Sequence, residues 1–149
     1  MSSDKKKIGI IGIGNTLRSD DGAGAYVCSL LEEKNLPATA IITQQLDIAM
    51  AEEFAKFDIV ILVDAAANET AFSFEPLHTT PQQPQSSSHH INAAMLAGLA
   101  KQLFATKTQF YLCAIGATNF EMGTTLSEKT KQHATDAAAM LLNWIKTND

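Results

Sequence analysis

The sequence is poor in arginine, cysteine and proline, and it has no long apolar run. Arg18 is the single arginine, and 16 acidic residues outnumber 11 basic ones to give a formal net charge of -5. A chain this acidic has little nonspecific attraction for nucleic acid or anionic lipid. No stretch is long and apolar enough for a signal sequence or a membrane span. We therefore expect a cytoplasmic protein with no nucleic-acid or membrane partner.

The two cysteines, Cys28 and Cys113, are far apart and lie in separate apolar runs. They do not form a CxxC motif. This placement favours buried free thiols over a disulfide or a metal-binding pair.

Short β-rich runs alternate along the chain with runs of helical period, which is typical of an α/β fold. The expected strands span residues 8–13, 40–43, 59–63, 72–77 and 109–115, the fourth as an edge strand. The expected helices span residues 23–33, 48–56, 92–104 and 127–145, the last capped by Ser127. Residues 81–88 are rich in Pro, Gln and Ser, and predict a surface loop. We expect a single domain over residues 1–149: a three-layer sandwich whose mostly parallel sheet of about five strands carries helices on both faces.

Open α/β sheets bind ligands beyond the carboxyl ends of their strands, and three polar features fall there. Asp20 and Asp21 follow the first strand, within the glycine-rich segment 12–24. Asp64 ends the strand of five consecutive apolar residues, where an aspartate is costly unless it is paired, hydrogen-bonded or metal-bound. His89 and His90 precede the third helix.

Carboxylates and an imidazole together form a ligand set for a borderline divalent ion such as zinc or nickel. Other interpretations remain open at this point. Asp20 or Asp21 can cap the first helix, and Asp64 can cap a turn. His78 and His133 are expected to be merely solvated.

Four blocks of the sequence, in order, resemble the nickel-iron hydrogenase maturation endopeptidase family. The blocks are Gly12-Ile13-Gly14-Asn15 with Leu17-Arg18-x-Asp20-Asp21-Gly22-x-Gly24, then Val60-Ile61-Leu62-Val63-Asp64-Ala65, then Ser88-His89-His90, and last Phe120-Glu121-x-Gly123-x-x-Leu126-Ser127. The sequence Gln45-Leu46-Asp47, with the later Ser-His-His, is most similar to the branch that serves cytosolic soluble hydrogenases.

The resemblance implies a peptidase that cuts the C-terminal extension from a hydrogenase large-subunit precursor after nickel has entered it. The family is thought to bind the substrate's nickel through three side chains, which correspond to Asp21, Asp64 and His89. His90 is the alternative to His89, and the metal is expected to be the nickel of the substrate rather than a permanently held ion.

The catalytic step is less defined by the sequence. No serine or cysteine stands beside a plausible histidine base, so a covalent nucleophile is unsupported. The metal can activate water or polarise the scissile carbonyl, or it can only dock the substrate while Asp20 or Asp21 acts as base. Gly14, Asn15 and Arg18 are the expected substrate-binding residues, Gly14 and Asn15 through backbone or amide donors.

Two other classes of protein share part of this pattern. A phospho-receiver signalling domain would use Asp20, Asp21 and Asp64. In that class, however, the acidic pair follows the first strand directly, and a lysine follows a late strand. In this chain a loop separates the strand from the acidic pair, and the lysine is missing. A dinucleotide-binding module needs GxGxxG, whereas Leu17 stands in place of the third glycine.

Overall fold

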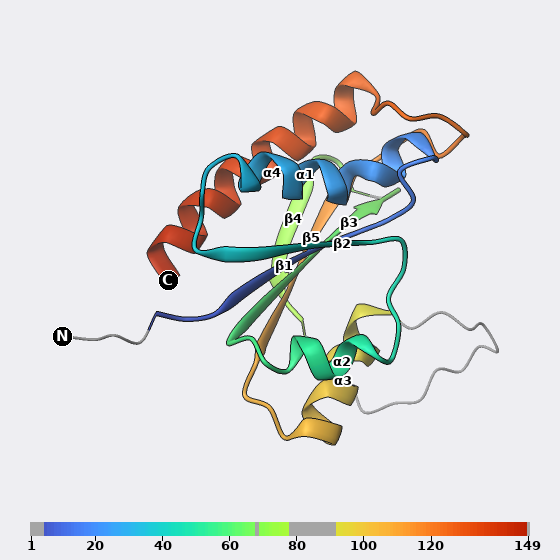
Figure 1. The fold of residues 1–149 in the computed structure, drawn as a ribbon. Helices are drawn as coiled ribbons and strands as arrows, with labels where there is room; N and C mark the ends of the chain where they lie inside the picture. The colour runs from blue at the N-terminus through green and yellow to red at the C-terminus, as the bar shows by residue number, and fades with distance from the viewer. Residues whose placement is uncertain (1–4, 68, 78–91, 149) are drawn as a thin grey trace.

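The computed structural model describes residues 5–67, 69–77 and 92–148 (Figure 1). Its elements in chain order are β1 (Ile8–Ile13), the 3-10 turn η1 (Ser19–Gly22), α1 (Ala23–Glu32), β2 (Ala38–Thr43), α2 (Met50–Phe54), β3 (Ile59–Ala66), β4 (Phe72–Pro76), α3 (Ala93–Phe104), β5 (Gln109–Gly116) and α4 (Glu128–Asn148). No helix among these is long and apolar enough to cross a membrane.

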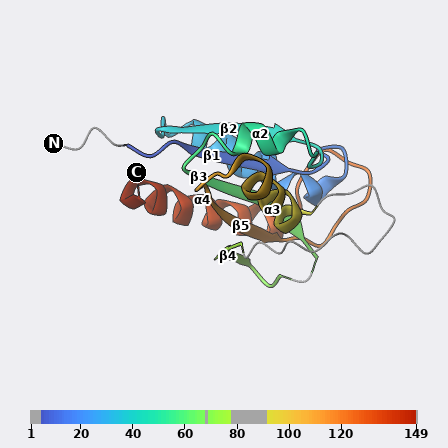
Figure 2. The ribbon, with the colours of Figure 1, turned by 90° about the horizontal axis from the view of Figure 1, so that it is seen from below.

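The sheet has the order β2-β1-β3-β5-β4, with every pair parallel except the antiparallel pair of β4 and β5. Helices α1 and α4 cover one face, and α2 and α3 cover the other (Figures 1 and 2). The expected three-layer α/β sandwich is confirmed, including the edge strand β4, which the structure shows to be antiparallel to β5. Because the central strands are parallel, their carboxyl ends meet along one edge of the sheet.

The core lies on both sides of β1 and β3, whose residues are buried on both faces as in other parallel sheets. Cys28 and Cys113 are both buried free thiols, as expected. Burial raises the pKa of each thiol to about 12, so neither is a reactive thiolate at neutral pH.

The element ends differ from expectation in a few places. Helix α2 is shorter than expected because its first expected residue, Ile48, lies in a turn, where the Asp47 carboxylate accepts from Ala49 N–H at 2.9 Å. Strand β3 continues past Asp64 because its residues keep pairing with β5 as far as Gly116. Ser127 Oγ accepts from Thr130 N–H at 3.4 Å at the start of α4, as expected for a cap. The expected loop 81–88 lies outside the described residues.

Helix α1 begins in close contact with the sheet, and Gly24 makes this possible. A Cβ atom at this position would lie 2.5 Å from the Val63 carbonyl oxygen and 2.8 Å from the Ile13 nitrogen, closer than real Cβ atoms come. The missing side chain therefore lets the turn before α1 lie directly over the carboxyl ends of β1 and β3.

Candidate active site

An open pocket of about 520 Å³ lies at the carboxyl edge of the sheet. Its lining comes from the loop after β1, the segment after β2, the end of β3, the start of α3 and strand β5. The lining residues are Ile13, Gly14, Asn15, Arg18, Asp21, Gln44, Gln45, Leu46, Asp64, Asn92, Ala93 and Leu112. Asp21 and Asp64, 43 positions apart in the sequence, thus reach the same pocket.

Asp21 is positioned by the backbone of the loop after β1. Its carboxylate accepts a hydrogen bond from Asn15 N–H at 2.7 Å. Gly14 has φ +142°, and a Cβ atom there would overlap the Asp21 carbonyl oxygen. Glycine at position 14 therefore lets the loop fold tightly around Asp21.

The backbone donors of this loop are used inside the protein. Gly14 N–H donates to the Thr43 carbonyl at 3.0 Å, and Asn15 N–H donates to Asp21. The side-chain oxygen of Asn15 accepts from Leu17 N–H at 2.9 Å. The backbone N–H groups of Gly14 and Asn15 are therefore both engaged within the fold, which leaves the side-chain NH₂ group of Asn15 as the amide donor that can face a substrate.

Asp64 lies next to Ile13 of β1 and Ala114 of β5 in the sheet register and is only partly exposed. Burial raises the pKa of its carboxyl group to about 6, the Ala65 N–H opposes the shift, and the negative charge of Asp21 adds to it. Two carboxylates thus repel each other in one partly desolvated pocket. A cation between them would relieve that repulsion.

The third expected ligand lies outside the described residues, since both His89 and His90 do. Within the part of the chain that the structure describes, no three His, Cys, Asp or Glu side chains gather in a way that could hold a metal ion. The structure therefore brings together two of the three expected ligands, Asp21 and Asp64.

Asp20 is in a very different environment from Asp21. Its side chain is 0% exposed and does not line the pocket. Its carboxylate accepts hydrogen bonds from Thr118 N–H at 3.0 Å, Asn119 N–H at 2.9 Å, Ser127 N–H at 2.7 Å, Ser127 Oγ at 2.9 Å and Thr130 Oγ1 at 2.7 Å. Burial raises the pKa of this carboxyl, but these donors outweigh burial and hold the pKa well below its usual range.

The same loop is tied to the segment after β5 by its backbone. Ser19 N–H donates to the Gly123 carbonyl at 2.9 Å, and Gly123 N–H donates to the Leu17 carbonyl at 2.9 Å. Arg18 Nε donates to the Phe120 carbonyl at 3.2 Å while its exposed side chain also lines the pocket. The first and last blocks of the sequence pattern, about 100 residues apart, therefore form one hydrogen-bonded unit.

His133 is not simply solvated, contrary to expectation. It is partly buried, and its Nδ1 lies 3.0 Å from the carbonyl oxygen of Gly116 at the end of β5. It does not line the pocket. Its position on α4 explains the difference, since α4 packs against β5 there.

Sequence reasoning did not identify several pocket residues, among them Gln44, Asn92 and Leu112. Gln44 follows β2, and Asn92 caps α3 by accepting from Met95 N–H at 2.9 Å. Both positions lie at the same edge of the sheet as Asp21 and Asp64. Their place at the carboxyl end of β2 and at the start of α3 is the feature from which they could have been predicted.

No protein-family model matches the chain, and neither does any curated protein sequence. Solved structures do match. The nickel-iron hydrogenase maturation protease HycI from Thermococcus kodakarensis aligns over 97% of this chain and 95% of its own, with a TM-score of 0.73 and 26% identity. The resemblance to the nickel-iron hydrogenase maturation endopeptidases that the sequence blocks indicate is therefore confirmed. The chain is accordingly a peptidase, a hydrolase.

More distant structures share this fold. The hydrogenase 2 maturation peptidase from a Thaumarchaeota archaeon has a TM-score of 0.70 and 22% identity over 94% of this chain and 98% of its own. The hydrogenase maturating endopeptidase HybD from E. coli has a TM-score of 0.68 and 16% identity over 95% of this chain and 93% of its own. The phospho-receiver alternative is not favoured, because Asp20 is buried among hydrogen-bond donors instead of lining the pocket with Asp21.

Proposed function

We propose that this endopeptidase removes the C-terminal extension from the large-subunit precursor of a nickel-iron hydrogenase, in the cytoplasm, once the precursor carries nickel. Asp21 and Asp64, with His89 as third ligand, bind the nickel of the substrate. The observation that carries the proposal is the convergence of Asp21 and Asp64 in one open pocket, where the negative charge of Asp21 makes ionisation of Asp64 less favourable.

The charges of the pocket support a cation as the group that is recognised. Among the described residues of the lining, Arg18 is the only basic one, and its Nε donates a hydrogen bond to the Phe120 carbonyl. Oxygen ligands from two carboxylates with one imidazole suit a borderline divalent ion such as nickel. Because the nickel belongs to the substrate, a precursor without it loses this attachment point.

We assign Asp20 a positioning role in place of the catalytic one expected from sequence. A general base must reach the proton that it takes and must have a pKa near the working pH. Asp20 meets neither requirement, since it is buried away from the pocket and its pKa is lowered. Its hydrogen bonds instead hold the loop that carries Asp21 against the segment after β5.

The lining of the pocket favours direct attack of water on the peptide bond. Among the described residues, no serine, threonine or cysteine lines it, so no side chain there is placed to form an acyl intermediate. In this mechanism Asp21 either binds the nickel or takes a proton from the attacking water. Asn15 and Arg18 contact the backbone of the substrate.

The proposal is tested by mixing the purified protein with nickel-loaded and with nickel-free precursor, and following the loss of the extension by mass spectrometry. Cleavage of the nickel-loaded form alone is expected. Cleavage of both forms would show that nickel is not what the pocket recognises, and cleavage of neither would remove this precursor as the substrate.

A further inference from the structure

Strand β2 is an edge strand of the sheet that the structure describes. Within the described residues it pairs with β1 alone. The Thr43 carbonyl accepts from Gly14 N–H at 3.0 Å on the β1 side. Because backbone groups alternate between the two sides of a strand, Ala40 and Ile42 turn their N–H and C=O groups to the open edge.

This edge lacks the features by which proteins usually prevent strands from adding to a sheet. The residues of β2 include no charge and no proline, and Ile42 is 49% exposed. The opposite edge strand, β4, carries Glu75 and ends at Pro76, both exposed. An uncharged, unbulged edge with free donors and acceptors is a template for another extended chain.

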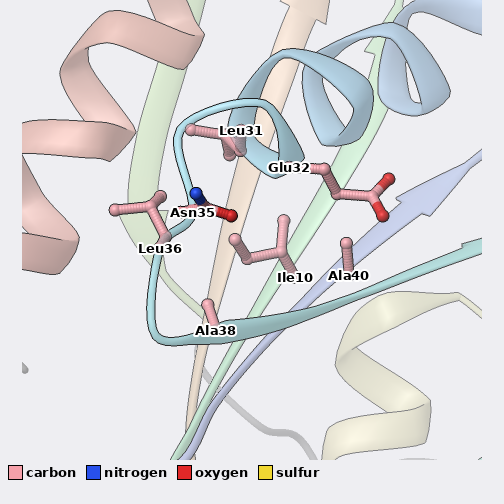
Figure 3. A pocket seen from close by; sticks show the side chains of 7 residues that line it. All are labelled: Ile10, Leu31, Glu32, Asn35, Leu36, Ala38 and Ala40. Carbon is pink, nitrogen blue, oxygen red and sulfur yellow. The ribbon is translucent and has the colours of Figure 1, made fainter.

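A groove lies beside β2 on the face covered by α1 (Figure 3). It has a volume of about 220 Å³, and the small side chains of Ala38 and Ala40 form part of its lining. Its floor is apolar, while Glu32 and Asn35 give it a polar rim. The lining residues are Ile10, Leu31, Glu32, Asn35, Leu36, Ala38 and Ala40. A side chain with an aliphatic stem and a polar or positively charged end fits these surroundings.

Strand β2 also runs directly into the candidate active site. Its last residue, Thr43, is followed by Gln44, Gln45 and Leu46, which line the pocket that holds Asp21 and Asp64. At about 3.3 Å per residue, the four residue steps from Ala40 in the groove to Gln44 in that pocket span about 13 Å. A chain laid along β2 therefore has one end at the site of cleavage.

We propose that the open edge of β2 binds the C-terminal extension of the precursor as an added antiparallel strand, with one of its side chains in the groove at Ala40. Strand β2 points toward the pocket, and the extension leads away from the cut, so the two run in opposite directions. Backbone hydrogen bonds along β2 would supply the affinity, as in other cases of strand addition. The groove would supply selectivity for one side chain of the extension. This inference rests on the proposed function.

Amide hydrogen exchange on the ¹⁵N-labelled full-length protein tests the pairing, with a synthetic peptide of the extension's sequence as the probe. The peptide is expected to slow exchange at Ala40 and Ile42 by about tenfold or more, while Thr39 and Ile41, already turned toward β1, change little. No slowing at peptide concentrations that inhibit cleavage would overturn the proposal. Slowing that grows with protein concentration without peptide would also overturn it, because a second copy would then occupy the edge.

Filling the groove tests its contribution to cleavage. Ala40→Leu is expected to raise KM for the nickel-loaded precursor by about tenfold and to leave kcat unchanged. This is the pattern expected when a lost contact had stabilised the bound substrate and the transition state equally. Thr39→Leu is the matched control, since residue 39 points to the other face and is exposed. Melting temperatures of both variants show whether they are folded.

A shortened precursor separates a binding effect from a structural one. An extension of about three residues is too short to reach Ala40 at about 3.3 Å per residue, so wild-type protein and Ala40→Leu should cleave it equally. An Ala40→Leu defect of the same size on the shortened precursor, or no defect on the full one, would overturn the proposal. If the wild-type protein cuts no precursor at all, the proposed function fails, and the exchange measurement still reports on the edge.

Discussion

Asp20 and Asp21 are neighbours in the sequence, but their carboxylates face different surroundings. Asp21 lines the open pocket and accepts one hydrogen bond, from Asn15 N–H. Asp20 is completely buried and accepts from the segment after β5 and from the start of α4, through Ser127 and Thr130 among others. The short turn Ser19–Gly22 thus directs one acid to the substrate and the other to the fold.

Asp21→Asn should separate activity from stability. Asparagine keeps an oxygen that can accept from Asn15 N–H, so the free energy of unfolding should change by about 1 kcal/mol or less. Cleavage of nickel-loaded precursor should be lost, because a neutral amide is a poor ligand for a divalent cation. Asp136→Asn is the matched control, since Asp136 is an exposed aspartate on α4 outside the pocket. Full activity in folded Asp21→Asn would remove Asp21 from the site.

Asp20→Asn should act in the opposite way, through stability. An amide NH₂ in place of one oxygen would face the N–H and O–H donors that now point at the carboxylate. We expect a loss of about 2–5 kcal/mol in the free energy of unfolding, measured by urea denaturation at pH 7. Because the pKa of Asp20 is lowered in the folded state, its contribution is present above pH 4 and is lost as the pH falls below that value. A variant as stable as the wild type would contradict the positioning role.

Asp64 should give the opposite pH dependence. Its pKa is about 6 in the folded protein, above the usual 3.8, so the folded state holds the proton more tightly than the unfolded state. The contribution of Asp64 to the free energy of unfolding therefore falls as the pH rises from 4 through 6. At about 1.4 kcal/mol per pKa unit the fall is at most about 3 kcal/mol, and solvent screening makes it smaller. Relative to the wild type, metal-free Asp64→Asn should gain stability between pH 4 and pH 6. Parallel curves for the two proteins would show that Asp64 is not perturbed.

His89 and His90 can be distinguished by nickel binding. We expect His89→Gln to weaken binding of Ni²⁺ by the free protein at pH 7.5, chosen so that imidazole is neutral, by about tenfold or more, while His90→Gln has little effect. Isothermal titration calorimetry measures both affinities. The reverse result would assign the third ligand to His90, and no effect of either would leave the metal with carboxylates alone.

The sequence predicted the layers of this fold because they depend on local periodicity. Five apolar residues before Asp64, for example, indicate a buried strand that reaches the edge of the sheet, although the strand itself continues to Ala66. The role of Asp20 was not predictable in the same way, because Thr118, Ser127 and Thr130 lie about 100 residues further on and no spacing rule links them to it. The open edge of β2 was also hidden, since strand order is a property of the whole sheet.

The central claim is that Asp21 and Asp64 bind the nickel of the substrate, and nickel K-edge X-ray absorption tests it most directly. The nickel-loaded precursor, with its scissile residues changed to prevent cleavage, is measured alone, with wild-type protein and with Asp21→Asn. Complex formation with the wild type should add oxygen or nitrogen neighbours to nickel, and Asp21→Asn should give fewer of them. An unchanged nickel spectrum in a complex shown to form by gel filtration would contradict the claim.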